Sequence, residues 1–248
     1  MLHAEIQHFS RAPITEAVID IRVRLVDGAN VEALVNLSPS IADEYPTRET
    51  LHIFQGEFEI SSGTVAQAKG RDLGVQGYRF VSAKRTAVVQ FRLDGFTFSR
   101  LRPYTDWLQV LAEAQRLWSC YVAVAPVEAL LRLAVRYINN FSIPPGARPG
   151  DYLVQPPVLP PGIDHGVVKA ALSRVLATDR DTRSNCLVTQ ALERTADDGI
   201  SVVLDIDAHK PVNLGPTVDF WAEFQQLHDV KNRIFFSSIT GLAAREFE

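Results

Sequence analysis

The sequence predicts an α+β protein in which two antiparallel sheets, each packed against one helix, are joined by a proline-rich connector. Three observations support this fold. Several segments alternate apolar and polar residues with the period of two that is typical of strands with one solvated face. Two segments carry apolar residues at the 3.6-residue spacing of an amphipathic helix. Between these groups, residues 142–162 include seven prolines, which neither a helix interior nor a central strand tolerates.

The first element is a strand over residues 17–26, where apolar residues alternate with Asp20, Arg22 and Arg24. A short helix is predicted over residues 30–37, because it begins at an asparagine, a favourable N-cap residue, and is expected to stop at the proline that follows.

Four further strands are expected over residues 51–60, 77–83, 86–93 and 96–101, with a glycine-rich and weakly patterned stretch between the first two. The last two strands are separated only by Asp94 and Gly95. This dipeptide is a strong hairpin signal, because both central positions of the tight turn need a positive φ.

The clearest helix pattern follows residue 103. Its apolar residues recur at spacings of three and four and include two tryptophans: Trp107, Val110, Leu111, Ala114, Leu117, Trp118 and Tyr121. Since Asp106, Glu113 and Arg116 lie off this stripe, one face of the helix is expected to pack on a sheet. A long strand over residues 129–141 follows it.

The second half repeats the order of strands followed by one helix. Strands are predicted over residues 185–193 and 200–208, and a helix follows Pro216 with Thr217 as its N-cap. Residues 167–177 suit either a helix or a buried strand, and their pattern alone leaves both alternatives open. Because no residue-level repeat accompanies this order, the similarity between the halves is architectural.

The proline-rich stretch marks the expected boundary between two halves, residues 1–148 and 149–248, which we expect to pack as one unit. Residues 1–150 hold 16 basic and 15 acidic side chains, whereas residues 151–248 hold 9 and 14. Within the first half, residues 69–136 hold 11 basic and 5 acidic side chains, so a basic region lies inside an acidic protein.

The composition is that of a globular protein, with 46% hydrophobic and 22% charged residues and a formal charge of −4. This balance excludes a strongly basic, histone-like polyanion binder. The opening segment MLHAEIQHFS lacks the apolar core of a secretory signal, and the longest apolar stretch, residues 120–127, is far shorter than a membrane span. We therefore expect a cytoplasmic protein with no membrane segment, whose two cysteines, Cys120 and Cys186, are buried thiols.

No motif for catalysis, cofactor binding or metal binding is found, so we expect no catalytic residue, no cofactor and no metal site, and a non-enzymatic role is favoured. The sequence has no glycine-rich phosphate loop, no nucleophile elbow and no histidine pair at zinc-ligand spacing. Asp205 and Asp207, near His209, suit a divalent cation. Alternation in a solvated strand produces the same pattern, and triads of distant residues stay open.

Five arginines form a candidate binding face on the predicted strands: Arg92, Arg100, Arg102, Arg132 and Arg136. If these strands are neighbours in register, the guanidinium groups converge on a surface suited to phosphates, nucleic acid or an acidic protein. The alternative is that each arginine pairs with an aspartate or glutamate on a solvated face and contributes little to stability. Strand order decides whether Arg92, Arg132 and Arg136 share a surface or point to opposite ends of the molecule.

Six segments that span most of the chain resemble, in order and spacing, a sporadically distributed and uncharacterised family of bacterial proteins: PITEAVIDIRV, GYRFVSA, DGFTFSRLRPYTDW, LRLAVRYINNF, VVLDID and KNRIFFSSIT. The resemblance implies a single two-part unit and a strand near Val167, and it carries no activity, cofactor or catalytic residue. Its matched blocks direct attention to polar residues such as Arg100 and Arg136. They also add Asn139 and Asn232 to the candidate binding residues.

These observations favour a non-enzymatic cytoplasmic binding or regulatory module. The sporadic distribution of the resembled family implies a defence or toxin–antitoxin setting, and hence a genetically linked protein partner. The alternative is a nucleic-acid or nucleotide-phosphate binding protein, including a phosphodiester-processing enzyme, that uses the arginine face. Assembly into a homo-oligomer is compatible with either hypothesis.

Overall fold

The computed structural model describes residues 7–61, 64–163 and 166–248, and the side chains of Ser38 and of residues 53–73 lie outside this description. The strands are β1 (Ile14–Leu25), β2 (Thr47–Ser61), β3 (Thr64–Val81), β4 (Ala87–Arg92), β5 (Gly95–Leu101), β6 (Val127–Ile143), β7 (Ala170–Thr178), β8 (Asn185–Arg194) and β9 (Ile200–Leu214). The helices are the 3₁₀ helix η1 (Val31–Leu37) and α1 (Ser38–Ile41), α2 (Trp107–Val124), α3 (Pro149–Tyr152), α4 (Trp221–Ser238) and α5 (Gly241–Arg245).

The described strands form one antiparallel sheet of nine strands in the order β2-β3-β4-β5-β1-β6-β9-β8-β7. The α+β class is confirmed, and the expectation of two separate sheets is wrong. The reason is the pairing of β6 with β9, which runs from Leu130 opposite Leu214 to Ile143 opposite Ile200. This ladder joins the strands predicted before the proline-rich stretch to those predicted after it, because β6 belongs to the first group and β9 to the second.

The sheet consists of two halves with the same plan, β1–β5 and β6–β9, which differ from the predicted halves of the chain. In each half the first strand, β1 or β6, lies at the centre, the last strand, β5 or β9, lies beside it, and the strands between them follow outward. A long helix comes after the last strand in both halves. The predicted repeat of strands followed by one helix is therefore present, although the proline-rich stretch connects β6 to β7 within the same sheet. The division at residue 148 stays a prediction.

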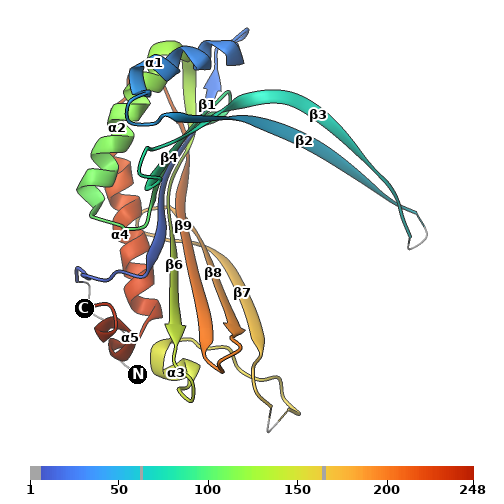
Figure 1. Ribbon diagram of the computed structural model, residues 1–248, viewed down its shortest axis with the longest axis vertical. Coiled ribbons are helices and arrows are strands. Elements are labelled where there is room, and N and C mark those ends of the chain that lie inside the picture. Colours follow the sequence, from blue (N-terminus) through green and yellow to red (C-terminus); the bar gives the residue numbers. More distant parts are fainter. Residues whose placement is uncertain (1–6, 62–63, 164–165) are drawn as a thin grey trace.

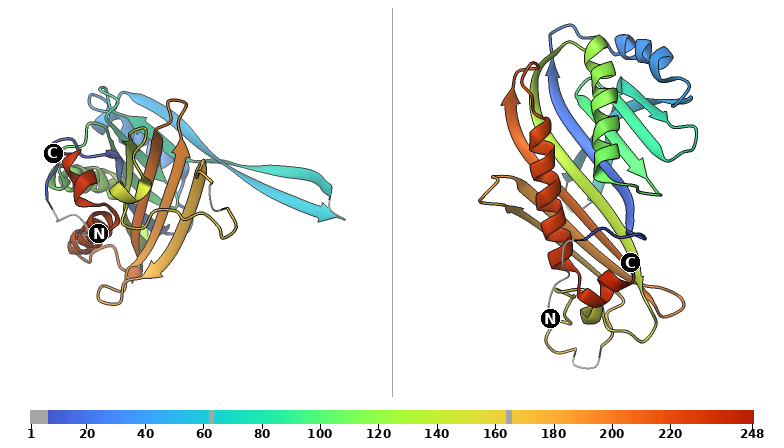
Figure 2. Two further views of the ribbon diagram at one scale, coloured as in Figure 1. Left: turned by 90° about the horizontal axis from the view of Figure 1, so that it is seen from below. Right: turned by 90° about the vertical axis from the view of Figure 1, so that its left-hand side faces the viewer.

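Helices α2 and α4 cover one face of the sheet and leave the other face open and concave (Figures 1 and 2). At one end of the sheet, β2 and β3 extend as a long two-stranded ribbon away from the helices (Figure 1). From Thr64 onward the weakly patterned stretch belongs to a strand, because β3 runs without interruption from Thr64 to Val81. At the other end, β7 is the outermost strand.

Helix α2 follows the predicted stripe closely. The Asp106 side chain caps it by accepting a hydrogen bond from the backbone N–H of Gln109 at 2.9 Å. The buried residues of the helix are those of the stripe, except that Leu111 is half-buried: Trp107, Val110, Ala114, Leu117, Trp118 and Tyr121. Trp118 and Tyr121 pack against Phe96 of β5 and Phe91 of β4, which places the core between α2 and the sheet.

Several boundaries differ from the predictions for local reasons. Pro39 does not end a helix. It lies in the first turn of α1, where backbone N–H groups have no acceptor within the helix, so a residue without an N–H is tolerated there. Helix α4 begins at Trp221, four residues beyond the predicted cap at Thr217. Cys186 is buried, as expected, whereas Cys120 is only half-buried. None of the described helices is long and apolar enough to cross a membrane.

Candidate functional site

Three of the five candidate arginines converge on the concave face of the sheet. Arg92 lies on β4, and Arg132 and Arg136 lie on β6. Their strands are held in register through β5 and β1, so that Arg22 lies opposite Arg132. The three arginines line one polar hollow of about 500 Å³ on this face. The strand order, which the sequence left open, therefore places these three arginines on one surface; their role in binding stays a prediction.

Asp20 of β1 is at the centre of this arginine cluster. Its carboxylate accepts hydrogen bonds from the Thr97 hydroxyl at 2.7 Å and from Arg132 at 3.1 Å. Arg22 and Arg92 also donate to it, at 3.2 Å and 3.4 Å. Since only 8% of Asp20 is exposed, one buried carboxylate is shared by three guanidinium groups.

Asp94 and two aspartates on β9 neutralise the remaining charge, and Asp94 accepts hydrogen bonds from both Arg22 and Arg92. Asp207 accepts two hydrogen bonds from Arg132, at 2.8 and 3.0 Å, and Asp205 accepts two from Arg136, at 2.6 and 2.8 Å. The hydrogen bonds that Arg136 donates to Asp205 raise the pKa of Arg136 above its usual value, although burial acts in the opposite direction. Asp205 and Asp207 therefore share a face, as their alternation predicts, and they serve as arginine partners. A phosphate would have to displace a bidentate carboxylate at either site.

Arg100 and Arg102 do not join this cluster. In β5, Arg100 has the parity of the buried Phe96 and Phe98, so it points to the side of the sheet that α2 covers. Arg102 donates to three backbone carbonyl oxygens, those of Ile14 (3.4 Å), Pro13 (3.5 Å) and Asn140 (3.2 Å). Their expected role in a shared binding face is therefore wrong, because strand parity and the end of β5 direct both side chains elsewhere.

The two candidate asparagines lie together on the opposite side of the sheet from the arginine cluster. Asn139 of β6 is 2% exposed and donates to the backbone oxygen of Leu204 at 2.9 Å. Asn232 of α4 accepts from the Lys231 ammonium at 2.6 Å. Both line a cavity of about 170 Å³ beneath α4. The seven candidate residues therefore belong to at least two separate regions of the molecule.

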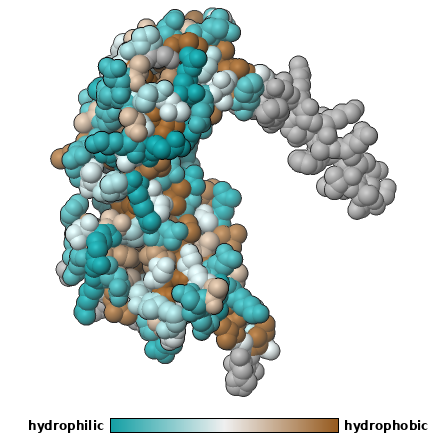
Figure 3. Space-filling view, viewed as in Figure 1, coloured by the Kyte–Doolittle hydropathy of each residue, from teal (hydrophilic) through white to brown (hydrophobic). Residues whose placement is uncertain are grey.

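A third region was not predicted from the sequence. The described residues include twelve large hydrophobic side chains that are exposed, and half of them lie between residues 158 and 176: Val158, Ile163, Val167, Leu172, Val175 and Leu176. Hydrophobic residues gather at this lower end of the molecule in the space-filling view (Figure 3). Soluble monomers seldom expose so many apolar side chains in one place without a binding role.

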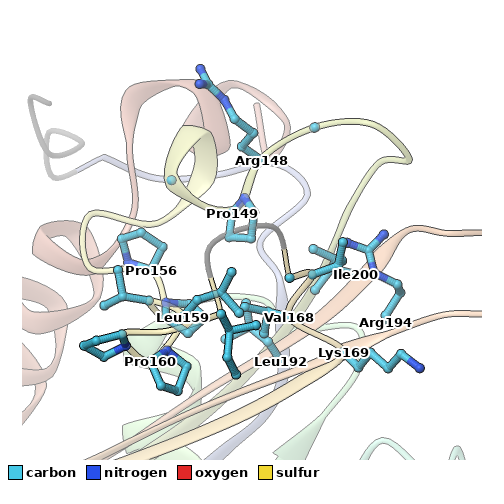
Figure 4. Close-up of a pocket in the computed structure, with 18 residues that line it drawn as sticks. Arg148, Pro149, Pro156, Leu159, Pro160, Val168, Lys169, Leu192, Arg194 and Ile200 are labelled. Carbon is cyan, nitrogen blue, oxygen red and sulfur yellow. The ribbon is translucent and has the colours of Figure 1, made fainter.

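Two adjoining hollows lie along this surface. One, of about 610 Å³, is lined by the proline-rich connector together with β8 and β9, and Pro149, Leu159, Val168 and Leu192 surround it (Figure 4). The charged end of Arg148 points away from it (Figure 4). The second hollow, of about 710 Å³, lies between α4 and the strands β7 and β8. The two share Pro156, Pro157 and Leu192, and so form a continuous apolar groove.

Strand β7 runs along this groove and ends the sheet. It forms its ladder with β8, from Ala170 opposite Glu193 to Thr178 opposite Asn185, and no described strand pairs with its other edge. The outward backbone N–H and C=O groups of β7 are therefore able to accept another strand. We call β7, the connector and the two hollows the β7 surface. The sequence contains a signal for this surface. Leu172, Val175 and Leu176 place apolar side chains on both faces of one strand, and a strand with one solvated face would place them on a single face.

Comparisons with protein-family models, with characterised proteins and with solved structures found no match. The resemblance to the sporadically distributed bacterial family therefore stays a prediction.

Proposed function

We propose that the protein is a non-enzymatic binding module that captures an extended segment of a partner protein on the β7 surface. The observation that carries this proposal is the coincidence of an unpaired edge strand with half of the exposed large hydrophobic side chains of the described chain. An added strand would gain backbone hydrogen bonds from β7. It would also cover Leu172 and Leu176, which are 73% and 66% exposed.

The charges beside the edge specify the chemistry of the partner. Lys169 and Arg174 are exposed, and no described acidic side chain pairs with either of them. A segment with apolar residues and at least one aspartate or glutamate therefore complements this edge. By contrast, a second copy that paired all nine residues of β7 with its own β7 would place Arg174 directly opposite Arg174, and like charges in that position are destabilising.

The arginine cluster gives less support to the nucleic-acid alternative. Polyanion binding draws its affinity from cations that are free to neutralise phosphates, whereas the convergent arginines here already bond to Asp20, Asp205 and Asp207. A partner encoded near this protein, in a defence or toxin–antitoxin setting, remains the biological context that the family resemblance implies.

The test compares proteins captured from native lysate by the tagged wild-type chain and by a Leu172→Asp, Leu176→Asp variant. Leu108→Asp serves as the matched control, because Leu108 is 72% exposed on α2, away from β7. We expect one stoichiometric, nuclease-resistant partner that binds the wild type and the control but is lost from the double variant. Amide hydrogen exchange of the purified complex should show protection of β7.

The same partner on all three proteins would refute the proposal. Nuclease-sensitive material that is lost from an Arg132→Ala, Arg136→Ala variant would support the nucleic-acid alternative instead. A concentration-dependent dimer that light scattering detects in the wild type and not in the β7 variant would show that a second copy covers this surface.

A further inference from the structure

The cavity beneath α4 is a separate feature from the β7 surface. It has a volume of about 170 Å³ and lies between α4, the start of α2 and the segment that leads into β1. At a share of about 30 Å³ per water molecule, this is room for roughly five waters. Apolar and aromatic side chains such as Phe9, Trp107 and Phe235 form much of its wall, and polar ones such as Asn139 and Lys231 form the rest. A cavity of this size and lining suits a small, mainly apolar molecule.

A buried lysine lies in the wall of this cavity. Lys231 of α4 is 5% exposed, and its ammonium nitrogen is 3.6 Å from the centre of the Tyr137 ring. It donates a hydrogen bond to the side-chain oxygen of Asn232 at 2.6 Å. The ring face and the amide oxygen both stabilise the charged form of the amine.

No described carboxylate lies within ion-pair distance of Lys231, in contrast to most basic side chains of the concave face. A buried cation without a counter-ion is costly, because ring and amide dipoles replace only part of its hydration. The Asn232 amide is oriented by the bond from Lys231, so its nitrogen is left as a donor. The Tyr104 hydroxyl, which lies 3.1 Å from that of Tyr137, is a second polar group of the cavity wall.

We propose that this cavity binds a small apolar carboxylate, whose oxygens contact the Lys231 ammonium and the Asn232 amide and whose carbon skeleton lies against the aromatic walls. The ligand supplies a counter-ion at the Lys231 ammonium. Asp106, a carboxylate that also lines the cavity, is engaged at the start of α2, where it accepts a hydrogen bond from the backbone N–H of Gln109 at 2.9 Å. This site is independent of the proposed function, since it shares no lining residue with the hollows of the β7 surface, although α4 contributes different residues to this cavity and to the second hollow.

The affinity is expected to depend on pH. Burial lowers the pKa of Lys231 to about 7, against a smaller opposing effect of Asp229. A carboxylate binds the protonated amine, so its affinity is highest below that pKa and falls about tenfold per pH unit above it. The charged and titratable groups around Lys231 are His228 and Asp229 on α4, Asp106 before α2, Tyr104, Tyr137 and His8.

His228 does not obscure this dependence. Its ring stacks on Trp107 at a centroid distance of 4.3 Å, and no described group bonds its Nδ1. Burial, together with the charge of Lys231, lowers the pKa of His228 to about 3. The imidazole therefore stays neutral across the range in which Lys231 titrates.

The test is calorimetric titration of the full chain with benzoate and with butyrate at pH 6.5 and pH 8.5. We expect saturable binding at pH 6.5 that weakens roughly twentyfold at pH 8.5, as a lysine pKa near 7 requires. Benzamide, which has the shape of benzoate without its charge, should not bind. Lys231→Met should lose binding, whereas Lys84→Met, at an exposed lysine in the turn after β3, should retain it.

A second measurement tests the proposal without any variant. At pH 7.5, heats recorded in two buffers of different ionisation enthalpy should show proton uptake by the wild type on binding, because the carboxylate favours the charged lysine. Absence of saturable binding at pH 6.5, equal affinity for benzamide, equal binding by Lys231→Met, or no proton uptake would each overturn the proposal. A Leu172→Asp, Leu176→Asp variant should bind benzoate normally, so failure of the β7 proposal would leave this one intact.

Discussion

Asp20→Asn tests whether charge holds the concave face of the sheet together. The substitution keeps the shape of the side chain and removes its charge, so Arg92 and Arg132, which are 11% and 29% exposed, lose their shared counter-ion. Removing one partner of a fully buried ion pair costs about 3–5 kcal/mol. Because Arg132 keeps its bonds to Asp207 and Arg92 keeps its bond to Asp94 at 2.9 Å, the loss is smaller than for a fully buried pair, and we expect about 2–4 kcal/mol.

The assay is thermal unfolding, and Asp205→Asn is the matched control. In a chain of this size, 1 kcal/mol shifts the melting temperature by about 2–4 °C, so a loss near 3 kcal/mol lowers it by about 6–12 °C. Asp205 bonds to Arg136, whose side chain is 46% exposed, and removal of such a solvated pair costs at most about 1 kcal/mol. The control variant should therefore melt within about 4 °C of the wild type.

The comparison refutes the reasoning if the two variants melt at the same temperature. That result would mean that Asp20 is solvated to the same extent as Asp205, although only 8% of Asp20 is exposed. Added salt supplies an independent check, since it should weaken the exposed Arg136 pair more than the buried Asp20 cluster.

Three further outcomes follow from the described contacts. His228, with its pKa lowered to about 3, stays neutral in the folded chain, whereas the unfolded chain takes up a proton below about pH 6.5. The free energy of unfolding should therefore fall between pH 6.5 and 3, and urea titrations of His228→Phe should show a shallower fall. Because the pKa of Lys231 is lowered to about 7, the native state binds fewer protons than the unfolded state between pH 7 and about 10.5. The free energy of unfolding of the wild type, relative to that of Lys231→Met, should therefore rise with pH over that window. A constant difference would contradict the lowered pKa of Lys231. Gly95→Ala places a Cβ atom 2.2 Å from the backbone oxygen of Ile21 at a φ of +152°, so circular dichroism should show a fall in melting temperature of at least about 5 °C.

Most elements of this fold could be predicted from local pattern. The stripe of α2 predicts its buried face, and the Asp94 and Gly95 turn predicts the β4–β5 hairpin, because both depend on residues that lie close together in the chain. Alternation likewise predicts that Asp20 and Arg22 lie opposite the core face of β1. These features follow from backbone geometry alone, so no distant contact was needed to predict them.

Residues 167–177 show where local pattern becomes insufficient. Their composition suits a helix or a buried strand, and the structure places a strand, β7, at the edge of the sheet with most of its side chains exposed. The family resemblance implied a strand in this region, but exposure depends on which elements cover it. Neither α4 nor another described strand covers β7 completely, so the binding surface became visible only in three dimensions.

The sequence by itself determined the α+β class, the alternation of the clearest strands and the presence of arginines among their polar residues. Tertiary structure alone decided that β6 pairs with β9 in a single sheet, that Arg92, Arg132 and Arg136 converge, and that aspartates neutralise them. It also decided that Lys231 is buried against Tyr137 without a described counter-ion. The physical reason is that side-chain direction is a property of neighbouring residues, whereas strand pairing, charge compensation and burial join residues that are about a hundred positions apart in the chain.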